Sequence, residues 1–365
     1  MHVGYSVIFQ NPEDRRTDLE VYTNELRLAE QAVALGYESV WSVEHHFTDY
    51  TMCPDVVQFL SYMAGKTDKT LLGSMVVVLP WHDPMRVAEQ ISMLDNMSGG
   101  RMILGMGRGV GRIEYEGFRL NMNESREMFD EYATMVVEAL ENGYMERDGQ
   151  FVKQPKRDIR PRPFKSFKGR TYTAAVSPES MPIVARLGMG LMIVPQKPWK
   201  MVENDIAAYT KVFEETHKTA PPPPLVAGWT FVDESADRAA EVGREYIRDY
   251  YRSVIKHYEF ASDHLTKTKG YEFYGQGFQR KVEEIGIEGV VDFLASMAVC
   301  GTPEQCYEQI MHQHKLIGMN AFMAITSYSG MPWDEAERNM QLFAKTVMPE
   351  LKKFDTPPLQ LAKSA

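Results

Sequence analysis

Three residues capable of acid–base chemistry stand side by side at Glu44-His45-His46. They follow segment 38–43, whose apolar residues are typical of a buried strand, so they lie at its carboxyl end. Successive side chains of an extended chain point to opposite sides, and therefore only one of the two histidines can face a given cavity. This argues against a metal pair of neighbouring histidines. It leaves one candidate proton carrier, unless both histidines are simple surface residues.

A second candidate site is the glycine-rich run 105–111, which contains Arg108 and follows another apolar strand pattern. The dinucleotide fingerprint GxGxxG does not fit, because Val110 and Arg112 occupy positions where it requires glycine. Glycines allow a ligand to approach the backbone closely, and an arginine can bind a phosphate with two hydrogen bonds. The alternative for Arg108 is a salt bridge to Glu114 or Glu116.

A third candidate is the segment 175–180, AVSPES, between a predicted strand and a predicted helix. Ser177 suits the N-cap position and Pro178 suits the first turn. The free amides and the dipole of a helix N-terminus attract phosphate groups. The segment therefore predicts either a phosphate site or a plain helix cap.

The elements that must position these residues alternate between strand and helix along the whole chain. Strand patterns occur at 2–9, 38–43, 71–79, 101–106, 172–176, 190–194, 225–232 and 321–326. Helix patterns lie between them, and the long ones near the end cover 235–258, 303–316 and 333–352. Such alternation indicates parallel strands, and eight repeats favour a closed (β/α)₈ barrel. We expect one barrel domain over 1–354 and a tail over 355–365.

Two segments interrupt the alternation. Segment 153–170 contains eight basic residues, one acidic residue and three prolines, and could be a phosphate-steering patch or a solvated loop. Segment 261–295 combines glycines and aromatic residues, which is typical of a lid over a site, with disorder as the alternative.

The overall composition excludes some classes of protein. Fifty acidic and 40 basic residues give a net charge of −10, which is unfavourable for binding nucleic acid. The sequence has neither a signal-peptide pattern nor an apolar run of about 18 residues, so we expect no membrane span. Three widely spaced cysteines suggest reduced thiols in a cytoplasmic protein.

Several motifs in order resemble the bacterial luciferase-like flavin monooxygenases. Segment 41–48, WSVEHHFT, is similar to the family's second-strand signature, and 79–118 resembles its longest block. Segment 267–273, KTKGYEF, resembles its mobile-loop region, and 301–306 and 348–351 match its closing motifs. The resemblance covers essentially the whole chain.

The resemblance implies a barrel that binds reduced FMN, supplied by a separate flavin reductase, at its carboxyl-terminal mouth. It implies reaction with O₂ through a C4a-peroxyflavin, oxygenation of a small apolar or carbonyl-containing substrate, and a dimer. It makes His45 the catalytic residue and Met75-Val76 a non-proline cis peptide beneath the flavin. The cofactor-binding residues that we expect from it are Met75, Val76, Arg108, Glu114, Ala175, Val176, Ser177 and Ser180.

The chain also departs from the family pattern. Gly107 stands where light-emitting members carry a cysteine, His82 lies one position early, and Val176 replaces an acid. These differences put light emission and an aldehyde substrate in doubt. Two alternatives stay open: an oxidoreductase that uses the deazaflavin F420, and a non-catalytic flavin-binding subunit.

Overall fold

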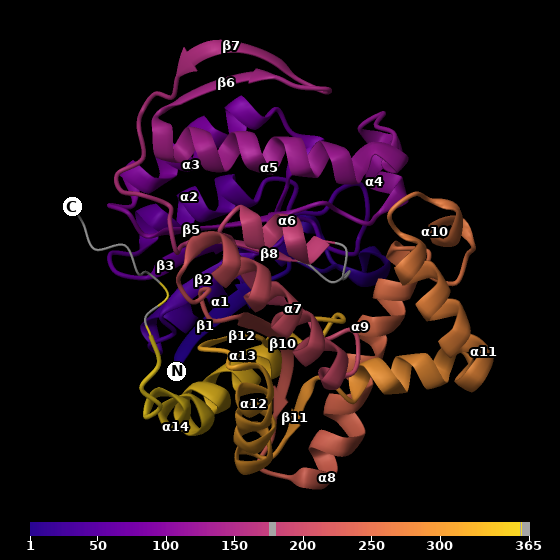
Figure 1. Ribbon diagram of the computed structural model, residues 1–365. Helices are drawn as coiled ribbons and strands as arrows, with labels where there is room; N and C mark the ends of the chain where they lie inside the picture. Colours follow the sequence, from indigo (N-terminus) through magenta and orange to yellow (C-terminus); the bar gives the residue numbers. More distant parts are fainter. Residues whose placement is uncertain (175–179, 358, 360–365) are drawn as a thin grey trace.

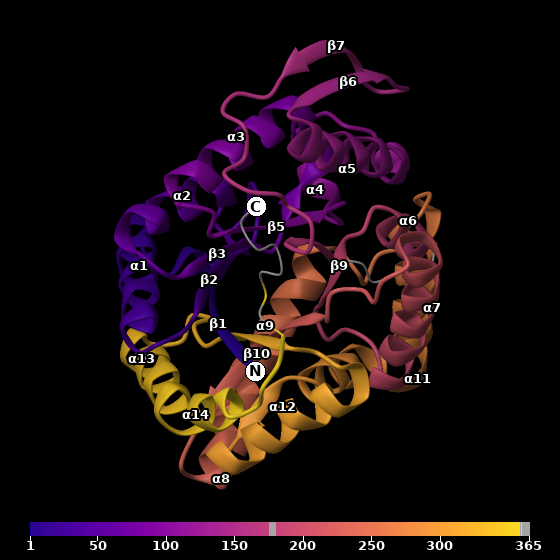
Figure 2. The ribbon, with the colours of Figure 1, turned by 60° about the vertical axis from the view of Figure 1, so that its left-hand side comes forward.

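The barrel is built from parallel strands that follow one another in chain order. The computed structural model describes residues 1–174, 180–357 and 359. The barrel strands are β1 (His2–Val7), β2 (Ser39–Ser42), β3 (Leu71–Ser74), β5 (Met102–Gly107), β8 (Thr171–Ala174), β9 (Gly190–Ile193), β10 (Leu225–Val232) and β12 (Ala321–Ile325). β12 pairs with β1, and β9 pairs with β10, so the sheet closes. The predicted (β/α)₈ barrel is confirmed, and Figure 2 shows the strands at the centre of a ring of helices.

The helices pack against the outside of the strands (Figure 1). They begin where the sequence places caps: Asp83 caps α3, which starts at Pro84, and Thr302 forms a capping box with Gln305. The described helices are α1 (Asp18–Ala34), α2 (Val56–Lys66), α3 (Pro84–Met97), α4 (Arg112–Gly117), α5 (Ser125–Asn142), α6 (Met181–Arg186), α7 (Trp199–His217), α8 (Ala236–Arg238), α9 (Arg244–His257), α10 (His264–Lys267), α11 (Glu272–Ala295), α12 (Pro303–Ile317), α13 (Trp333–Leu342) and α14 (Met348–Lys352).

Large side chains fill the barrel next to glycines on neighbouring strands. Trp41 of β2 is completely buried, and a Cβ atom built on Gly73 of β3 would lie 2.1 Å from its ring. A Cβ atom on Gly4 of β1 would lie 2.9 Å from the Trp41 Nε1 atom. The interior is therefore a close-packed core, and any site must lie at an end of the barrel.

The predicted strand 71–79 is interrupted. β3 ends at Ser74, β4 (Val77–Val78) pairs separately with β5, and the Met75–Val76 peptide between them is cis. A Cβ atom on Gly105 would lie 2.1 Å from the Ser74 carbonyl oxygen, so the two segments touch through backbone.

The basic segment 153–170 lies away from the carboxyl ends of the strands. It begins with β7 (Lys153–Asp158), which forms an antiparallel hairpin with β6 (Tyr144–Asp148) beside α5 (Figure 1). It ends at Arg170, a buried residue that binds Asp95 and the carbonyl oxygen of Met102, the first residue of β5. The segment is anchored at the amino-terminal end of the barrel, and the choice between a phosphate-steering patch and a solvated loop stays a prediction.

The long insertion between β10 and α12 is helical. It contains α8, α9, α10 and α11, and β11 (Val299–Gly301), which extends the sheet beside β10. Segment 261–295 is therefore ordered as α10 and α11, with a kink at Gly286, and the alternative of disorder is not what the structure shows. Its function as a lid stays a prediction.

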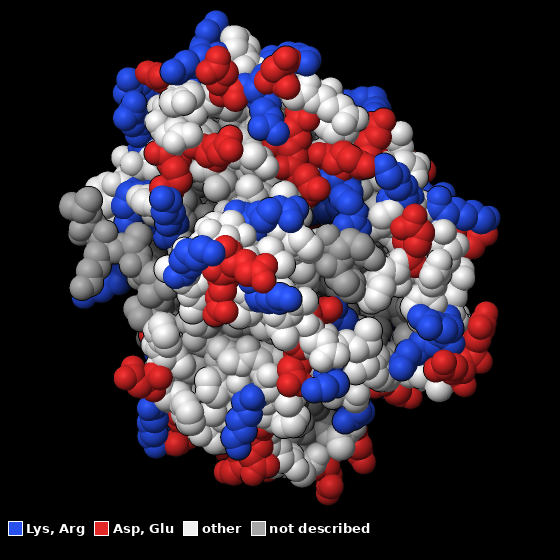
Figure 3. Space-filling model, viewed as in Figure 1, with Lys and Arg blue, Asp and Glu red and all other residues white. Residues whose placement is uncertain are grey.

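The amino terminus and Asn320, the residue before β12, contact the described residues that follow α14. The Met1 amino group bonds the carbonyl oxygen of Phe354, Thr356 and Pro357 bond Asn320, and Leu359 is buried. On the face shown in Figure 3, basic side chains are interspersed with acidic ones. No helix within the described residues is long and apolar enough to cross a membrane.

Candidate active site

His46 and His82 share the buried carboxylate of Glu44. The His46 Nε2 atom lies 3.1 Å and the His82 Nε2 atom 2.6 Å from Oε1 of Glu44, while the Val78 amide donates to Oε2 at 2.8 Å. Burial opposes ionisation, but the hydrogen bonds from both histidines hold the pKa of Glu44 below its usual value. Burial also opposes charge on His82, yet its bond to Glu44 raises the pKa of His82. Both oxygens of Glu44 are satisfied.

His45 turns the other way and binds a different carboxylate. Its Nδ1 atom donates to Oε1 of Glu114 at 2.9 Å, and the same oxygen accepts the His46 amide at 3.0 Å. His257 of α9 places its Nε2 atom 3.7 Å from that oxygen. Burial opposes ionisation of Glu114, but the two nearby imidazoles lower its pKa to about 2. Glu114 is thus a carboxylate that holds His45.

The bond to Glu114 decides which nitrogen of His45 can act. Because the Nδ1–H group is engaged with the carboxylate, Nε2 is the nitrogen at which the neutral form of the ring accepts a hydrogen bond or a proton. The Tyr258 hydroxyl lies 3.2 Å from this Nε2 and donates to it. The His45 ring also packs edge-on against Tyr50 at 4.9 Å and against His257 at 5.1 Å. His45 is therefore oriented from both sides.

Arg108 begins the loop after β5 and has an unused nitrogen. Its guanidinium stacks on Tyr271 at 3.9 Å, and its Nη1 atom is shielded from solvent without a hydrogen-bond partner among the described residues. The expected alternative partners are engaged elsewhere, since Glu114 holds His45 and Glu116 lies 4.0 Å from Arg112. A buried, unpaired guanidinium nitrogen is unfavourable unless a ligand occupies it, which fits an anion site.

A second arginine lies beside Arg108 and was not a predicted site residue. A Cβ atom on Gly270 would lie 2.9 Å from Arg108 Nη1 and 3.1 Å from Arg126 Nε, so both guanidinium groups adjoin this glycine. Gly270 has a φ of 81°, which favours glycine. Arg126 is in the first turn of α5, a helix that the sequence analysis did not include.

The insertion closes over the glycine-rich loop. The Tyr271 hydroxyl donates to the Gly109 carbonyl oxygen at 2.7 Å, and the Lys269 amide donates to Asn123 at 2.9 Å. Lys269 also pairs with Glu127, and Tyr271 is completely buried. The beginning of the lid-like segment therefore lies directly over Arg108.

Only a small residue fits on β5 beside the cis peptide between Met75 and Val76. A Cβ atom on Gly107 would lie 2.3 Å from Cγ2 of Val76. A cysteine at 107, as in light-emitting relatives of the family that the motifs resemble, could not enter without moving Val76. The structure brings Val76 and Gly107 together.

The predicted phosphate turn is only partly described. Ala175, Val176 and Ser177 lie outside the described residues, while Ser180 immediately precedes α6. The loops after β2 and β5 meet α4 and α9 at the mouth. The contribution of 175–177 stays a prediction.

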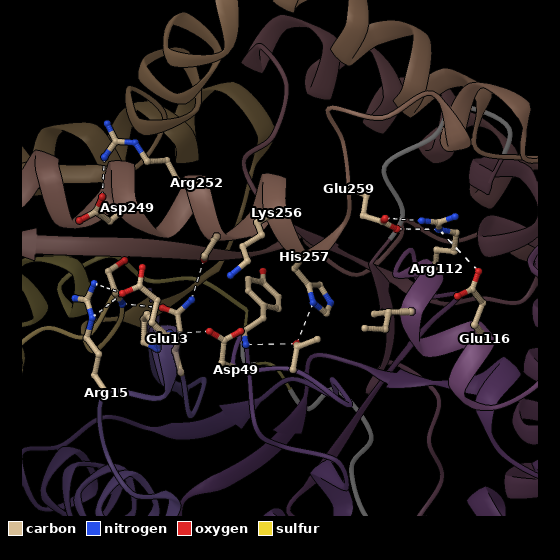
Figure 4. A pocket seen from close by; sticks show the side chains of 17 residues that line it. Glu13, Arg15, Asp49, Arg112, Glu116, Asp249, Arg252, Lys256, His257 and Glu259 are labelled. Carbon is tan, nitrogen blue, oxygen red and sulfur yellow. Dashed lines mark hydrogen bonds and ion pairs between the residues drawn. The ribbon is translucent and has the colours of Figure 1, made fainter.

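Several cavities open at this end of the barrel. His45 and His46 line one of about 670 Å³. Another, of about 550 Å³, has charged walls and includes His257, Asp49, Lys256 and Glu259 (Figure 4). An aromatic cavity of about 310 Å³ lies between α9 and α11 and is lined mainly by aromatic and aliphatic side chains, among them Tyr251, Phe260, Phe273, Tyr274, Phe278 and Phe293. Sequence reasoning did not identify these cavities, although the aromatic residues of 261–295 signalled the aromatic one.

Known proteins resemble this chain over nearly its full length. The alkanal monooxygenase alpha chain of Photorhabdus luminescens is 26% identical over 359 residues, which covers 96% of each chain. A monooxygenase from Streptomyces bottropensis has the same fold, with a TM-score of 0.79, 24% identity, and coverage of 96% of this chain and 99% of that one. The oxygenating constituent of 3,6-diketocamphane monooxygenase from Pseudomonas putida, solved with FMN, has a TM-score of 0.74 at 16% identity. The match covers 96% of this chain and 99% of that one.

The fold also occurs in enzymes that use a deazaflavin. The coenzyme F420-dependent tetrahydromethanopterin reductase of Methanopyrus kandleri has a TM-score of 0.65 at 19% identity, covering 96% of this chain and all of that one. The family model for luciferase-like monooxygenases matches residues 1–319. The chain therefore belongs to the luciferase-like monooxygenase family, and the prediction of a flavin-dependent monooxygenase is confirmed.

Proposed function

We propose that this protein is the oxygenase component of a two-component system. It takes reduced FMN from a separate reductase and uses O₂ to oxygenate a small apolar or carbonyl-containing organic substrate. One observation carries the proposal: His45, whose Nδ1 atom is held by the Glu114 carboxylate, stands at the same barrel mouth as a buried nitrogen of Arg108 that has no partner among the described residues. The first suits proton handling and the second suits a cofactor phosphate.

The residues present fit FMN. Arg108 would hold the phosphate, together with Arg126, Ser177 and Ser180, and the Met75–Val76 peptide would lie beneath the ring system. Reduced FMN supplies the electrons that activate O₂, and passage through a C4a-peroxyflavin is part of the proposal. Ala175 and Val176 are proposed contacts of the same turn.

Glu114 receives a different role from the one expected at first. It was a candidate contact of the flavin, but its carboxylate accepts hydrogen bonds from His45 and from the His46 amide. We propose that it positions His45, whose Nε2 atom accepts a proton from, or returns it to, the reacting groups. Exclusion of water is assigned to segment 261–295, whose Tyr271 covers Arg108.

The aromatic cavity between α9 and α11 supports an apolar substrate. Phe260, one of its walls, stacks 5.5 Å from Tyr258, and Tyr258 bonds His45. Two aromatic rings, those of Phe260 and Tyr258, therefore lie between the cavity and the proposed catalytic residue. A reductase partner, a dimer and a cytoplasmic location belong to the same proposal.

Oxygen incorporation is the experiment that tests this function. The protein would be supplied with FMN, NADH and a flavin reductase under ¹⁸O₂, with a panel of ketones, aldehydes and terpenoids. A product that gains one ¹⁸O atom, and none in the absence of FMN, is the expected result. Substrate reduction with reduced F420, without oxygen uptake, would favour the deazaflavin alternative. Flavin binding without turnover of any kind would favour the non-catalytic subunit.

A further inference from the structure

His257 is a buried histidine for which the proposed mechanism has so far no use. It stands at the end of α9, in the insertion, and its side chain is only 2% exposed. Its ring stacks on Tyr50 at 4.3 Å, and Nδ1 lies 3.1 Å from the Thr48 hydroxyl. Nε2 points towards Glu114 and has no hydrogen-bond partner among the described residues. A nitrogen buried without a partner calls for an explanation.

The arrangement around Glu114 is close to a relay but is not closed. The carboxylate oxygen that accepts the His45 Nδ1 proton at 2.9 Å is 3.7 Å from His257 Nε2. The longer distance exceeds that of a hydrogen bond, although a shift of well under 1 Å would close it. The other Glu114 oxygen has no partner among the described residues, so the carboxylate has spare capacity. One carboxylate can thus serve two imidazoles in turn.

His257 lines a different cavity from the one that His45 lines together with His46. It belongs to the wall of the 550 Å³ cavity, whose residues include neither His45 nor Glu114. Figure 4 shows His257 between Lys256 and the ion pair of Arg112 with Glu259, with Asp49 on the opposite wall. Charged walls of this kind hold water, which can exchange protons with an imidazole. His257 therefore stands between this water and the Glu114 carboxylate.

We propose that His257 is a positioning and proton-relay residue that links His45, through Glu114, to the charged cavity. The inference rests on the proposed role of His45. After His45 takes a proton at Nε2, its Nδ1 proton passes to Oε1 of Glu114 and then to the unprotonated Nε2 of neutral His257. His257 releases its Nδ1 proton to the cavity, so both rings are neutral again as Nε2–H tautomers. When His45 Nε2 returns its proton to the reacting groups, the reverse transfer from the cavity through His257 and Glu114 restores the Nδ1–H tautomers.

The same three groups define a competing possibility, a bound metal ion. Their ligand atoms lie within 4.8 Å of one another, a spacing that two histidines and a carboxylate also show around a divalent cation. The 2.9 Å contact between His45 and Glu114 is a normal hydrogen-bond distance, which favours a proton between them. A metal is therefore treated as an outcome of the test.

The test is a histidine NMR titration of the flavin-free protein with chelator present. Long-range ¹H–¹⁵N spectra report the tautomer and protonation of each ring, and the His45→Asn and His257→Asn variants assign the signals. We expect His45 as the Nδ1–H tautomer, and a His45 titration midpoint that moves by at least 0.5 pH unit in His257→Phe, because the two imidazoles share the Glu114 carboxylate and the variant leaves it to His45 alone. The charged and titratable groups facing His257 are Glu114, His45, Asp49, Tyr50, Tyr258, Lys256 and Glu259.

Two comparisons make the result decisive. The exposed His312→Asn variant should leave the His45 curve unchanged, and Glu114→Gln should abolish the effect of His257→Phe. Identical His45 curves in the wild type and in His257→Phe would overturn the proposal. The proposal would also be overturned if chelator changed the His45 signals of the protein as purified and added Zn²⁺ restored them, because the three groups would then bind a metal ion. The measurement needs neither flavin nor substrate, so an inactive protein with coupled histidines would contradict the proposed function alone.

A kinetic readout separates a relay from a packing role. Reduced FMN and O₂ give measurable H₂O₂ release without a substrate, and its pH profile and solvent isotope effect can be compared between variants. His257→Phe should shift the profile and reduce the isotope effect while leaving the FMN dissociation constant within twofold. An unchanged profile would leave His257 as packing against Tyr50 and would refute the relay.

Discussion

Two carboxylates at the barrel mouth each lie beside two histidines, but they differ in how completely they are satisfied. Glu44 uses both oxygens, on His46, His82 and the Val78 amide. Glu114 leaves one oxygen and the Nε2 atom of His257 without partners among the described residues, and a cavity adjoins it. The comparison teaches that the satisfied cluster fixes the loops after β2 and β4, while the unsatisfied one has capacity to move a proton.

The largest expected effect comes from replacing one histidine of each cluster by alanine and comparing the two variants. His45→Ala should reduce oxygenation at least 100-fold, because general acid–base catalysis contributes about 10²–10⁴ in rate. His46→Ala should reduce it less than 10-fold and lower the melting temperature instead. Product formation and thermal unfolding measured on both variants test this. Equal losses of activity in both would remove the distinction between the clusters.

Removing each carboxylate should affect stability unequally. Glu44→Gln should cost about 3 kcal/mol of unfolding free energy, because it leaves two half-buried histidines and the Val78 amide without their shared anion. Glu114→Gln should cost about 1 kcal/mol, since the amide oxygen still accepts from His45 and the buried charge is gone. Urea unfolding of both variants at pH 6 measures the difference. A larger loss in Glu114→Gln would reverse our assignment of the structural cluster.

The stabilising effect of the Glu44 cluster should depend on pH in a defined way. The folded-state pKa of Glu44 lies below its ordinary value of 4.5, so its contribution is present above that pH and is lost as the pH falls through the folded value. The pKa of His82 lies above its ordinary value of 6.5, so its contribution is present below that pH and is lost as the pH rises through the folded value. The wild type should therefore exceed Glu44→Gln most between pH 4.5 and 6.5. A pH-independent difference would contradict this.

A smaller effect is expected on FMN affinity, which should depend on Arg108 and on neither carboxylate cluster. Arg108→Gln should weaken FMN binding by about 2 kcal/mol, roughly 30-fold, through loss of a charge-assisted hydrogen bond to the phosphate. Glu114→Gln serves as the matched control and should change affinity less than threefold. Anaerobic titration with reduced FMN, and with reduced riboflavin as a ligand without phosphate, measures both. Equal affinities of wild type and Arg108→Gln for FMN would remove Arg108 from the site.

The smallest effect concerns the lid. Tyr271→Phe removes only the hydrogen bond to the Gly109 carbonyl oxygen and should loosen the closed segment by about 1 kcal/mol. Hydrogen exchange of residues 261–275 should become about fivefold faster. Exchange that stays at the wild-type rate would show that this bond does not keep the segment in place.

The sequence predicted the barrel well because its strands are apolar and its helices have recognisable caps. β10 begins and ends as expected, and Pro84 and Thr302 mark helix starts. α5 was overlooked although Met128, Tyr132 and Met135 repeat at helical spacing. The β6–β7 hairpin could not be predicted, because its strands are mostly exposed and lack apolar alternation.

The site was predictable only where a motif lies at a strand end. His45 and Arg108 follow β2 and β5, so their location at the mouth was foreseeable. His257 and Tyr258 are more than 200 residues from His45 in an insertion without a motif, and only the folded chain brings them together. Arg126 was missed together with its helix.

The central claim is that the unsatisfied cluster serves flavin and oxygen chemistry, and stopped-flow absorbance tests it most directly. The purified protein would be mixed with anaerobic reduced FMN and then with oxygenated buffer. We predict an oxygenated-flavin absorbance band that persists for seconds or longer in the wild type and in His46→Ala and decays faster in His45→Ala. Immediate reoxidation in the wild type, at the rate of free reduced FMN, would contradict the account.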